Sequence, residues 1–316
     1  MKKYMISVAM TTYNGEKYIL KQLESIAKQS LPADEVIICD DGSTDNTVIL
    51  IKKYINENKL KKWSVYKNDK RLGYVNNFIK AIELTKGDYI FLADQDDIFY
   101  ANKFRVMINY FENNKKCKLL NANFNIIDKN DNICNELRTH ARAKRPNGII
   151  KIDFKRWLYE SSFPGFSMGF RSEIREKLKD INVENCYGHD QLIGLIALSE
   201  DANYEINDVL SGYRMHDNNT TGGNNVLHDY SIEKRIRLKE KELNEYRQLQ
   251  IIINNNGFVN MDYDFLEARK AELEARISYL RRGDIMAAIK LLFISKSYHK
   301  PTILGDLLFL FKDKIK

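Results

Sequence analysis

Cysteine and long apolar runs are scarce in this chain of 316 residues, and each scarcity narrows the class of protein. Its four cysteines lie far apart without the spacing of a metal site, and this pattern in a lysine-rich chain favours a reducing cytosol. No apolar run is long enough to span a bilayer. The start, Met1 to Tyr4, leads directly into an apolar strand and lacks the core of a signal peptide. We therefore expect a cytoplasmic protein.

A large excess of charge of either sign is also absent. The chain has 50 basic and 43 acidic residues and a formal net charge of +7, which suits anionic ligands such as phosphates or a membrane face. It contains no motif that combines aromatic and basic residues in the manner of RNA-binding domains, so we expect no nucleic-acid partner. A hydrophobic content of 44% and a charged content of 29% are typical of a globular protein. This length allows one sizeable domain plus an appendage.

The most informative stretch is a run of four apolar residues followed by three carboxylates. Ile90 to Ala93 predicts a buried strand, and Asp94, Asp96 and Asp97 follow where it ends. Ionised carboxylates this close repel one another, and a bound divalent cation would supply the missing charge. Asp94 and Asp96 are two residues apart, so an extended backbone places them on one side. The alternative is an acidic loop in which Asp97 caps the next helix.

Strands and helices alternate through the first hundred residues. Apolar segments predict strands over residues 6–10, 36–39, 63–66 and 90–93. Helical periodicity predicts helices over residues 16–29, over a segment that ends near residue 58, and over residues 76–85. This order favours a doubly wound, mostly parallel sheet. Its strands end in polar residues, at the edge where open α/β sheets bind ligands.

Three of these polar strand ends carry a family resemblance. They are Thr11-Thr12-Tyr13-Asn14-Gly15, Asp40-Asp41-Gly42-Ser43-Thr44-Asp45 and Asp94-Gln95-Asp96-Asp97. With these motifs in this order the chain resembles family 2 glycosyltransferases of the GT-A fold, and Ala93 before the third motif makes it similar to bacterial rhamnosyltransferase-like members that build cell-surface polysaccharides. The resemblance extends to about Gly223. It implies an α/β fold of the GT-A nucleotide-diphospho-sugar transferase type, with a mixed, mostly parallel sheet.

The resemblance also implies a reaction and a nucleotide-sugar site. The reaction is inverting transfer of a sugar, rhamnose among the candidates, from a dTDP- or UDP-sugar to a hydroxyl of a cell-surface polysaccharide or lipid-linked acceptor. The implied nucleotide-sugar residues are Thr11, Tyr13, Asn14, Asp41, Arg71, Asn76, Asp94 and Gln95. Among these, Thr11 and Tyr13 would hold a pyrimidine nucleoside, and Asp41 would accept the N–H of its ring.

Metal binding and catalysis fall to three further residues. Asp96 is the expected direct ligand of Mn²⁺ or Mg²⁺, and His216, in a motif that the resemblance connects with the metal, would complete the protein's share. Asp190, in Gly188-His189-Asp190-Gln191, matches the acidic residue that serves as general base. Without the resemblance, Asp190 is equally well interpreted as the cap of a helix over residues 192–198.

Two segments of the second half are expected near the site. Residues 138–147 are rich in Lys and Arg and predict a mobile loop over the site. Residues 163–170 are punctuated by glycine, and the resemblance places them beside the donor sugar and the acceptor. A plain strand with a bulge is the alternative for this second segment.

After residue 225 the composition changes to highly charged helical segments. We therefore expect a transferase domain over residues 1–225, divided into a nucleotide-binding half (1–97) and an acceptor half (98–225), and a helical region over 226–316. The last apolar stretch, residues 303–311, fits either a helix on a membrane surface or one docked on the domain or on a second subunit. The expected partners are thus a nucleotide-diphospho-sugar, a saccharide or lipid-linked saccharide, and either the inner face of the membrane or a second copy of the chain.

Two other functions remain open at this point. A sugar-1-phosphate nucleotidylyltransferase shares the α/β plan and the metal, but it carries a glycine-rich loop near its start, where residues 11–15 offer one glycine. A non-catalytic scaffold would keep the sugar-nucleotide fold without the reaction. The presence of Asp94, Asp96, Asp190 and His216 argues against a scaffold.

Overall fold

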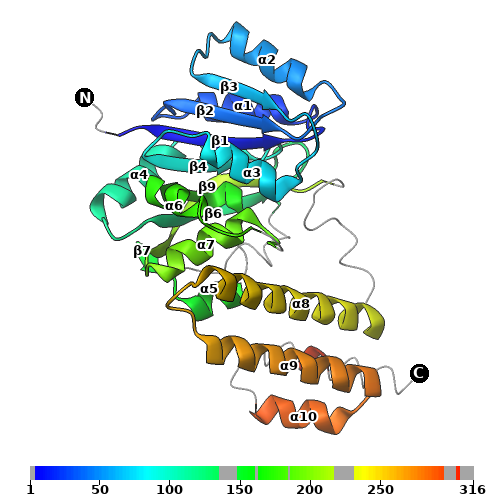
Figure 1. Cartoon of the computed structure of the whole chain (residues 1–316). Helices are drawn as coiled ribbons and strands as arrows, with labels where there is room; N and C mark the ends of the chain where they lie inside the picture. Colours follow the sequence, from blue (N-terminus) through cyan, green and yellow to red (C-terminus); the bar gives the residue numbers. More distant parts are fainter. Residues whose placement is uncertain are drawn as a thin grey trace. The chain divides into compact units, whose positions relative to one another are not determined.

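The computed structural model describes residues 4–134, 148–160, 163–183, 186–216, 231–294 and 304–306 (Figure 1). These residues form two compact units. The first contains the described residues up to Asn182, those from Cys186 onward to 216, and Phe258–Asn260; the second contains most of the described residues after 230. The predicted boundary at residue 225 and the predicted loop over residues 138–147 lie outside the described residues. Both therefore stay predictions, as does the division at residue 97.

One mixed sheet organises the first unit. Among the described residues its nine strands are β1 (Ile6–Thr12), β2 (Glu35–Asp40), β3 (Trp63–Lys67), β4 (Tyr89–Ala93), β5 (Ile98–Phe99), β6 (Leu119–Ile127), β7 (Ile149–Lys151), β8 (Met168–Arg171) and β9 (Asn203–Arg214). Their order is β3-β2-β1-β4-β8-β6-β9-β5, with β7 paired to β9. The first four strands and the β6–β9 pair are parallel, whereas β8 runs antiparallel to both neighbours. The predicted α/β fold with a mostly parallel sheet is confirmed.

Helices cover both faces of this sheet. They are α1 (Ile19–Ala27), α2 (Thr47–Glu57), α3 (Tyr74–Glu83), α4 (Lys103–Asn113), α5 (Phe154–Glu160), α6 (Ser172–Leu178) and α7 (His189–Ser199). On one face, α1 and α4 contribute to a core with Ile6, Val8 and Met10 of β1. Because side chains alternate along a strand, their neighbours point to the other face, where α3 packs on β1 and β2 and against α7. All seven residues of β1 are buried for this reason.

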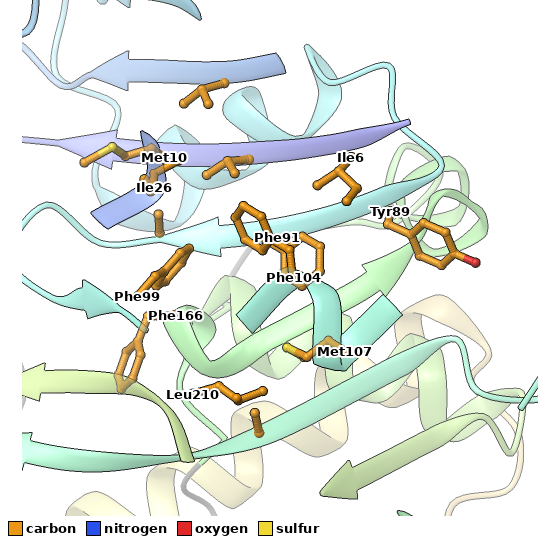
Figure 2. Close-up of a cluster of buried hydrophobic side chains, with 14 of the residues drawn as sticks. Ile6, Met10, Ile26, Tyr89, Phe91, Phe99, Phe104, Met107, Phe166 and Leu210 are labelled. Carbon is orange, nitrogen blue, oxygen red and sulfur yellow. The ribbon is translucent and has the colours of Figure 1, made fainter. Parts of the chain in front are cut away.

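The core on the α4 face is rich in aromatic rings. Figure 2 shows Phe91 of β4 close to Phe104 of α4, and their ring centroids are 4.5 Å apart. Phe99 of β5 meets Phe104 edge to face at 5.9 Å. Such pairs add about 0.5–1.5 kcal/mol each beyond the area they bury. These ring contacts pack β4 and β5, the strands on either side of residues 94–97, against α4.

The segment after β4 contradicts one sequence-based alternative. Asp97 does not cap a helix, because Ile98 and Phe99 form strand β5. Its carboxylate instead accepts a hydrogen bond from the backbone N–H of Arg214 at 2.9 Å. Within residues 163–170, a short 3₁₀ turn over Gly165–Ser167 leads into strand β8, which pairs with β4 and β6 without a break in register. The place of this segment beside the donor sugar and the acceptor stays a prediction.

The second unit is helical, as the charged periodic segments predict. Its helices are α8 (Ile232–Asn256), α9 (Tyr263–Arg282) and α10 (Ile285–Ile294), and α8 lies alongside α9 (Figure 1). Gly257 ends α8 with a φ of 61°, a left-handed conformation that glycine adopts without a steric cost. Leu243 of α8 and Leu273 and Ile277 of α9 form its core.

A buried carboxylate joins the short segment 304–306 to these helices. Asp306 is 1% exposed and accepts hydrogen bonds from Arg235 at 2.7 Å, from Arg276 at 2.6 Å and from the hydroxyl of Tyr279 at 2.7 Å. The rest of the predicted apolar stretch, except Leu304 and Gly305, lies outside the described residues. Among the residues that are described, none of the helices is both long enough and apolar enough to cross a membrane.

Candidate active site

The candidate site lies where the strand order reverses. From β1 the chain adds β2 and then β3 on one side, and it then places β4 on the other side of β1. A crevice opens beyond the carboxyl ends of two such strands, because their connections leave in opposite directions. Residues 13–15 follow β1 and residues 94–97 follow β4, so two of the predicted motifs flank this point.

Gln95 joins these two motifs. Its side-chain carbonyl accepts from the N–H of Tyr13 at 2.8 Å, and its amide N–H donates to the Tyr13 carbonyl at 3.0 Å. This amide therefore extends the pairing of β1 and β4 by one step. Gly15 makes room for it, because a Cβ there would lie 2.1 Å from the Gln95 oxygen. Gln95, a predicted nucleotide-sugar residue, thus contacts the protein backbone in this structure.

Asn14 holds the second motif against the first. Its backbone N–H donates to the Ser43 hydroxyl at 2.8 Å, and its side-chain oxygen accepts from the N–H of Thr44 at 2.9 Å. Buried Asp40 accepts from Thr12 at 2.8 Å and from the N–H of Ser43 at 2.8 Å. These contacts give the loop after β2 a defined shape. Asn14 has a φ of 48°, a left-handed value that Asn tolerates better than most residues.

Asp41 organises the loop that follows β3. Its carboxylate accepts from the backbone N–H groups of Leu72 at 2.7 Å and Gly73 at 3.0 Å and from the amide of Asn68 at 3.0 Å. A carboxylate has about four acceptor positions, so one remains for a ligand. Arg71 lies 3.8 Å from the same carboxylate.

Arg71 and Tyr13 meet at the entrance of this site. The guanidinium lies 4.0 Å from the Tyr13 ring centroid, and its side chain is 65% exposed. The structure therefore brings Tyr13, Arg71 and Asp41 together. It places Thr11 in the buried part of β1, and it engages the Asn76 side chain with the Leu72 carbonyl at 3.2 Å.

The predicted metal ligands are neighbours although 120 residues separate them. His216 Nε2 lies 2.9 Å from Asp96 Oδ2. Two atoms that bind one octahedral Mg²⁺ at 2.0–2.1 Å, at a right angle, lie about 3 Å apart. The pair thus fits adjacent positions on one ion. The part of the chain that the structure describes holds no group of three or more metal-ligating side chains.

Asp94 and Asp190 lie close enough for the charge of one to act on the other. Burial raises the pKa of Asp94 to about 8, and the charges of Asp96 and Asp190 act in the same direction. A bound cation reverses this shift, because it favours the ionised carboxylate. Asp190 is the second residue of α7. The N-cap position belongs to Gly188, which has no side chain, so Asp190 does not occupy the N-cap position. The Asp190 carboxylate accepts from the N–H of Gln191, the next residue, at 2.9 Å.

Two basic side chains, Arg214 and Lys103, are buried near the residues that follow β4, and the sequence interpretation gave neither a role. Arg214 is fully buried and donates from Nε to the Asp96 carbonyl at 2.7 Å. Lys103 is fully buried at the start of α4, and Nζ donates to the Phe166 carbonyl and to the Ser211 hydroxyl at 2.8 Å. Burial lowers the pKa of Lys103 to about 7, and the charge of Asp97 opposes that shift. Lys103 begins an ordinary amphipathic pattern, so no local signal marks it.

His189, which precedes Asp190 in the Gly188–Gln191 motif, is also a residue to which the sequence interpretation gave no role. Its ring is 6% exposed and stacks on Phe78 of α3 with centroids 3.8 Å apart. Neither ring nitrogen has a hydrogen-bond partner among the described residues. Burial lowers the pKa of this imidazole. It packs against Gly165, where a Cβ would lie 2.6 Å from Nε2.

Comparison with known sequences gives a consistent result. The family model described as Glycosyl transferase family 2 matches residues 7–178, more than half of the chain. The uncharacterized glycosyltransferase MJ1057 of Methanocaldococcus jannaschii is 33% identical over 181 residues, which cover 57% of this chain and 60% of the relative. TarS of Staphylococcus aureus, a poly(ribitol-phosphate) beta-N-acetylglucosaminyltransferase, is 39% identical over 99 residues, 31% of this chain and 17% of TarS. The chain therefore spans less than two thirds of these curated relatives.

Solved structures show the same fold at lower identity. Residues 1–349 of S. aureus TarS in complex with UDP-GlcNAc match with a TM-score of 0.56 and 19% identity, over 97% of this chain and 81% of that one. The mannosyltransferase PcManGT of Pyrobaculum calidifontis, in complex with GDP-Man and Mn²⁺, matches with a TM-score of 0.53 and 16% identity, over 100% of this chain and 87% of that one. At these identities the likeness establishes the GT-A fold alone.

Proposed function

Because the chain belongs to glycosyl transferase family 2, we propose that it moves a sugar from a nucleoside diphosphate donor to a hydroxyl of a saccharide acceptor, with inversion. The donor in this proposal is a dTDP- or UDP-sugar, rhamnose among the candidates, and the acceptor belongs to a cell-surface polysaccharide or a lipid-linked saccharide. TarS, which acts on a poly(ribitol-phosphate) and whose structure contains UDP-GlcNAc, supports a pyrimidine nucleotide and a polymeric acceptor.

The observation that carries this proposal is the contact of Asp96 with His216 at the strand-order reversal. Two ligating atoms 2.9 Å apart offer adjacent positions to one divalent cation. When bound there, Mn²⁺ or Mg²⁺ supplies positive charge that stabilises a leaving diphosphate. PcManGT, whose structure contains Mn²⁺ with its donor, supports the same choice of metal.

The nucleoside occupies the side of the site formed by Tyr13, Arg71 and Asp41. The Arg71 guanidinium and the Tyr13 ring are flat groups on which a nucleotide base stacks. In the structure the guanidinium lies 4.0 Å from the ring centroid. The remaining acceptor position of Asp41 takes the ring N–H of a uracil or thymine. Asp94, at the end of β4, contacts the ribose or a water on the metal.

Asp190 acts as the base in this proposal. A sugar held between the diphosphate and Asp190 presents its anomeric carbon to an acceptor that approaches from the Asp190 side. The carboxylate takes the proton of the acceptor hydroxyl as the new C–O bond forms and the bond to the diphosphate breaks. Attack opposite the leaving group inverts the configuration.

Nucleotide-sugar turnover tests the proposal directly. We expect a panel of UDP- and dTDP-sugars to contain at least one that raises the melting temperature in the presence of Mn²⁺ and is slowly hydrolysed. A chelator should abolish both effects. Asp190→Asn should lower transfer by about 10²–10⁴-fold with unchanged donor binding, because Asn keeps the shape but does not take up the proton.

Three results would contradict the proposal. Absence of hydrolysis and of stabilisation with every donor favours the scaffold, and formation of a nucleotide-sugar from a sugar phosphate and a nucleoside triphosphate favours the nucleotidylyltransferase. Normal turnover by Asp190→Asn would show that Asp190 is not the base.

A further inference from the structure

Two tyrosines beside Asp190 leave large parts of their rings in solvent. Tyr74, the first residue of α3, is 52% exposed, and Tyr187, two residues before α7, is 37% exposed. A single exposed ring is ordinary on a protein surface. The arrangement of these two rings, and their position next to the proposed base, distinguish them from other exposed aromatic side chains.

The two tyrosines are connected to each other. The hydroxyl of Tyr74 donates a hydrogen bond to the backbone carbonyl of Tyr187. Tyr74 follows Gly73, whose N–H donates to Asp41 at 3.0 Å, so its backbone belongs to the loop that Asp41 organises. The pair therefore bridges the nucleotide side of the site and the segment that leads into α7.

The same segment holds the Asp190 carboxylate. Gly188 directly follows Tyr187, and a Cβ on Gly188 would lie 2.3 Å from Asp190 Oδ1. Its φ of −159° is extended backbone that any residue adopts, so close approach of the carboxylate, and not backbone conformation, requires glycine here. The peptide unit between Tyr187 and Gly188 therefore has two neighbours. The Tyr74 hydroxyl donates to its carbonyl, and the Asp190 carboxylate lies close to Gly188.

The helices next to the pair pack against each other. Phe78, one turn after Tyr74 on α3, stacks on His189 of α7 at 3.8 Å with an interplanar angle of 20°. Both rings are buried, and α3 packs against α7 at this point. Tyr74 therefore begins a helix that packs on α7, and Tyr187 lies in the segment that leads into α7.

We propose that Tyr74 and Tyr187 form the subsite for the acceptor sugar, a pyranose whose apolar C–H face packs on the exposed rings. The proposal rests on the proposed function of Asp190 as the base. The face of an aromatic ring is negative and attracts the weakly positive C–H groups of a sugar ring. A sugar stacked here presents a neighbouring hydroxyl to the carboxylate of Asp190.

Acceptor kinetics of the full chain test this subsite. The variants are Tyr74→Ala and Tyr187→Ala, each with its Phe counterpart. Tyr66→Ala serves as a control, because Tyr66 is an exposed tyrosine (39%) that lies in strand β3 and not in the segments that carry the pair. Methyl glycosides of the common hexoses serve as acceptors. We expect each Ala variant to raise the acceptor KM about three- to tenfold, as loss of one aromatic contact would. Tyr187→Phe, which keeps the ring, and Tyr66→Ala should keep the KM of the wild type. Tyr74→Phe keeps the ring but loses the hydrogen bond to the Tyr187 carbonyl, so it should raise the KM less than Tyr74→Ala does.

Donor hydrolysis in water, measured without acceptor, separates this inference from the proposed function. Unchanged hydrolysis in the Ala variants, together with a raised acceptor KM, supports the subsite. An unchanged acceptor KM in both Ala variants overturns it. An equal loss of hydrolysis and transfer also overturns it, because the pair then serves the donor or the fold.

Binding without turnover provides a second measurement. Saturation-transfer difference NMR with the same methyl glycosides should show contact between the sugar C–H protons and the wild-type chain. The signal should vanish in Tyr187→Ala and persist in Tyr187→Phe. Absence of any signal with the wild type, or an equal signal in the Ala variant, overturns the proposal even if no donor is hydrolysed.

Discussion

Asp96 carries an electrostatic cost before any ligand binds. It lies beside two further carboxylates, and its charge contributes to the raised pKa of both Asp94 and Asp97. Like charges in one site repel each other. A cation bound by Asp96 and His216 would offset this repulsion, because it attracts the same carboxylates. The effect of removing this side chain therefore differs between the free and the ligand-bound protein.

We predict that Asp96→Ala abolishes metal-dependent binding of a nucleoside diphosphate and leaves the stability of the ligand-free protein equal or higher. Titration calorimetry with UDP and Mn²⁺, and thermal unfolding without them, measure the two effects. Glu57→Ala, an exposed carboxylate paired with Lys53 on α2, is a suitable control. Unchanged nucleotide affinity in Asp96→Ala would remove the metal assignment.

His189 gives a prediction about pH. Its folded-state pKa is lower than the ordinary value of 6.5 because the ring is buried, so the unfolded chain binds a proton that the folded chain does not. This contribution to stability is present above pH 6.5 and is lost as the pH falls toward the folded-state pKa. Each unit between the two pKa values corresponds to about 1.4 kcal/mol.

His189→Leu should therefore gain stability relative to the wild type as the pH falls from 8 to 5, on the order of one kcal/mol per pKa unit. Urea unfolding at several pH values gives the difference between the two proteins, which cancels the contribution of the other histidines. A difference that stays constant over this range would show that the ring is accessible to protons in the folded state.

The sequence identified Asp96 and His216 as a pair, but it gave no role to Lys103 or Arg214. The first two belong to motifs whose spacing is visible locally, and a family resemblance connects them. Lys103 is buried because β9 and the 165–167 turn meet over it, which no window of sequence reveals. Asn14 and Gln95 were predicted to contact the nucleotide, and this stays a prediction; the structure shows that both hold neighbouring loops together.

At the scale of elements, the turn over Gly165–Ser167 depends on contacts with distant segments. The Ser167 hydroxyl and N–H both donate to the Pro164 carbonyl, at 2.8 and 2.9 Å. The Phe166 ring stacks on Tyr213 of β9 with centroids 5.4 Å apart. Lys103 then joins this turn to β9 through its two hydrogen bonds. A strand was predictable here from the apolar residues, whereas the turn before it was not, because its partners come from α4 and β9.

Lys103→Met should lower the free energy of unfolding by about 1–3 kcal/mol, because it leaves the buried Phe166 carbonyl and Ser211 hydroxyl without their donor. Lys115→Met is the matched control. Lys115 pairs with Glu112 on the surface, so its loss should cost less than about 1 kcal/mol. A cost below that of the control would mean that solvent reaches the Lys103 amine. Chemical unfolding of both variants decides.

At the scale of the molecule, the chain divides into the sheet unit and the helical unit. All the proposed donor contacts, from Thr11 to His216, belong to the sheet unit. The alternation of strands and helices made this unit predictable, since parallel strands require crossover helices. The function of the helical unit was not predictable, because charged helices that pack through few apolar side chains carry no chemical motif.

Truncation after Asn225 should leave a protein that binds the nucleotide with unchanged affinity but transfers poorly to a lipid-linked acceptor. The reason is that the removed helices contribute no proposed donor contact, whereas we assign them to acceptor or partner contact. Titration with UDP and Mn²⁺ and a transfer assay on the same preparation test both parts. Full transfer by the truncated chain would refute the second part, and loss of nucleotide binding the first.

The contact between Asp96 and His216 also has a consequence during synthesis. A ribosome delivers about 5–20 residues per second, so the 120 residues between these two side chains take roughly 6–24 seconds to follow. For that interval the nascent chain carries the three carboxylates without His216 and without Arg214, which joins the backbone of the same loop to β9. An unfinished chain thus lacks one of its two proposed metal ligands, and the proposed site is complete only after the chain has been made beyond β9.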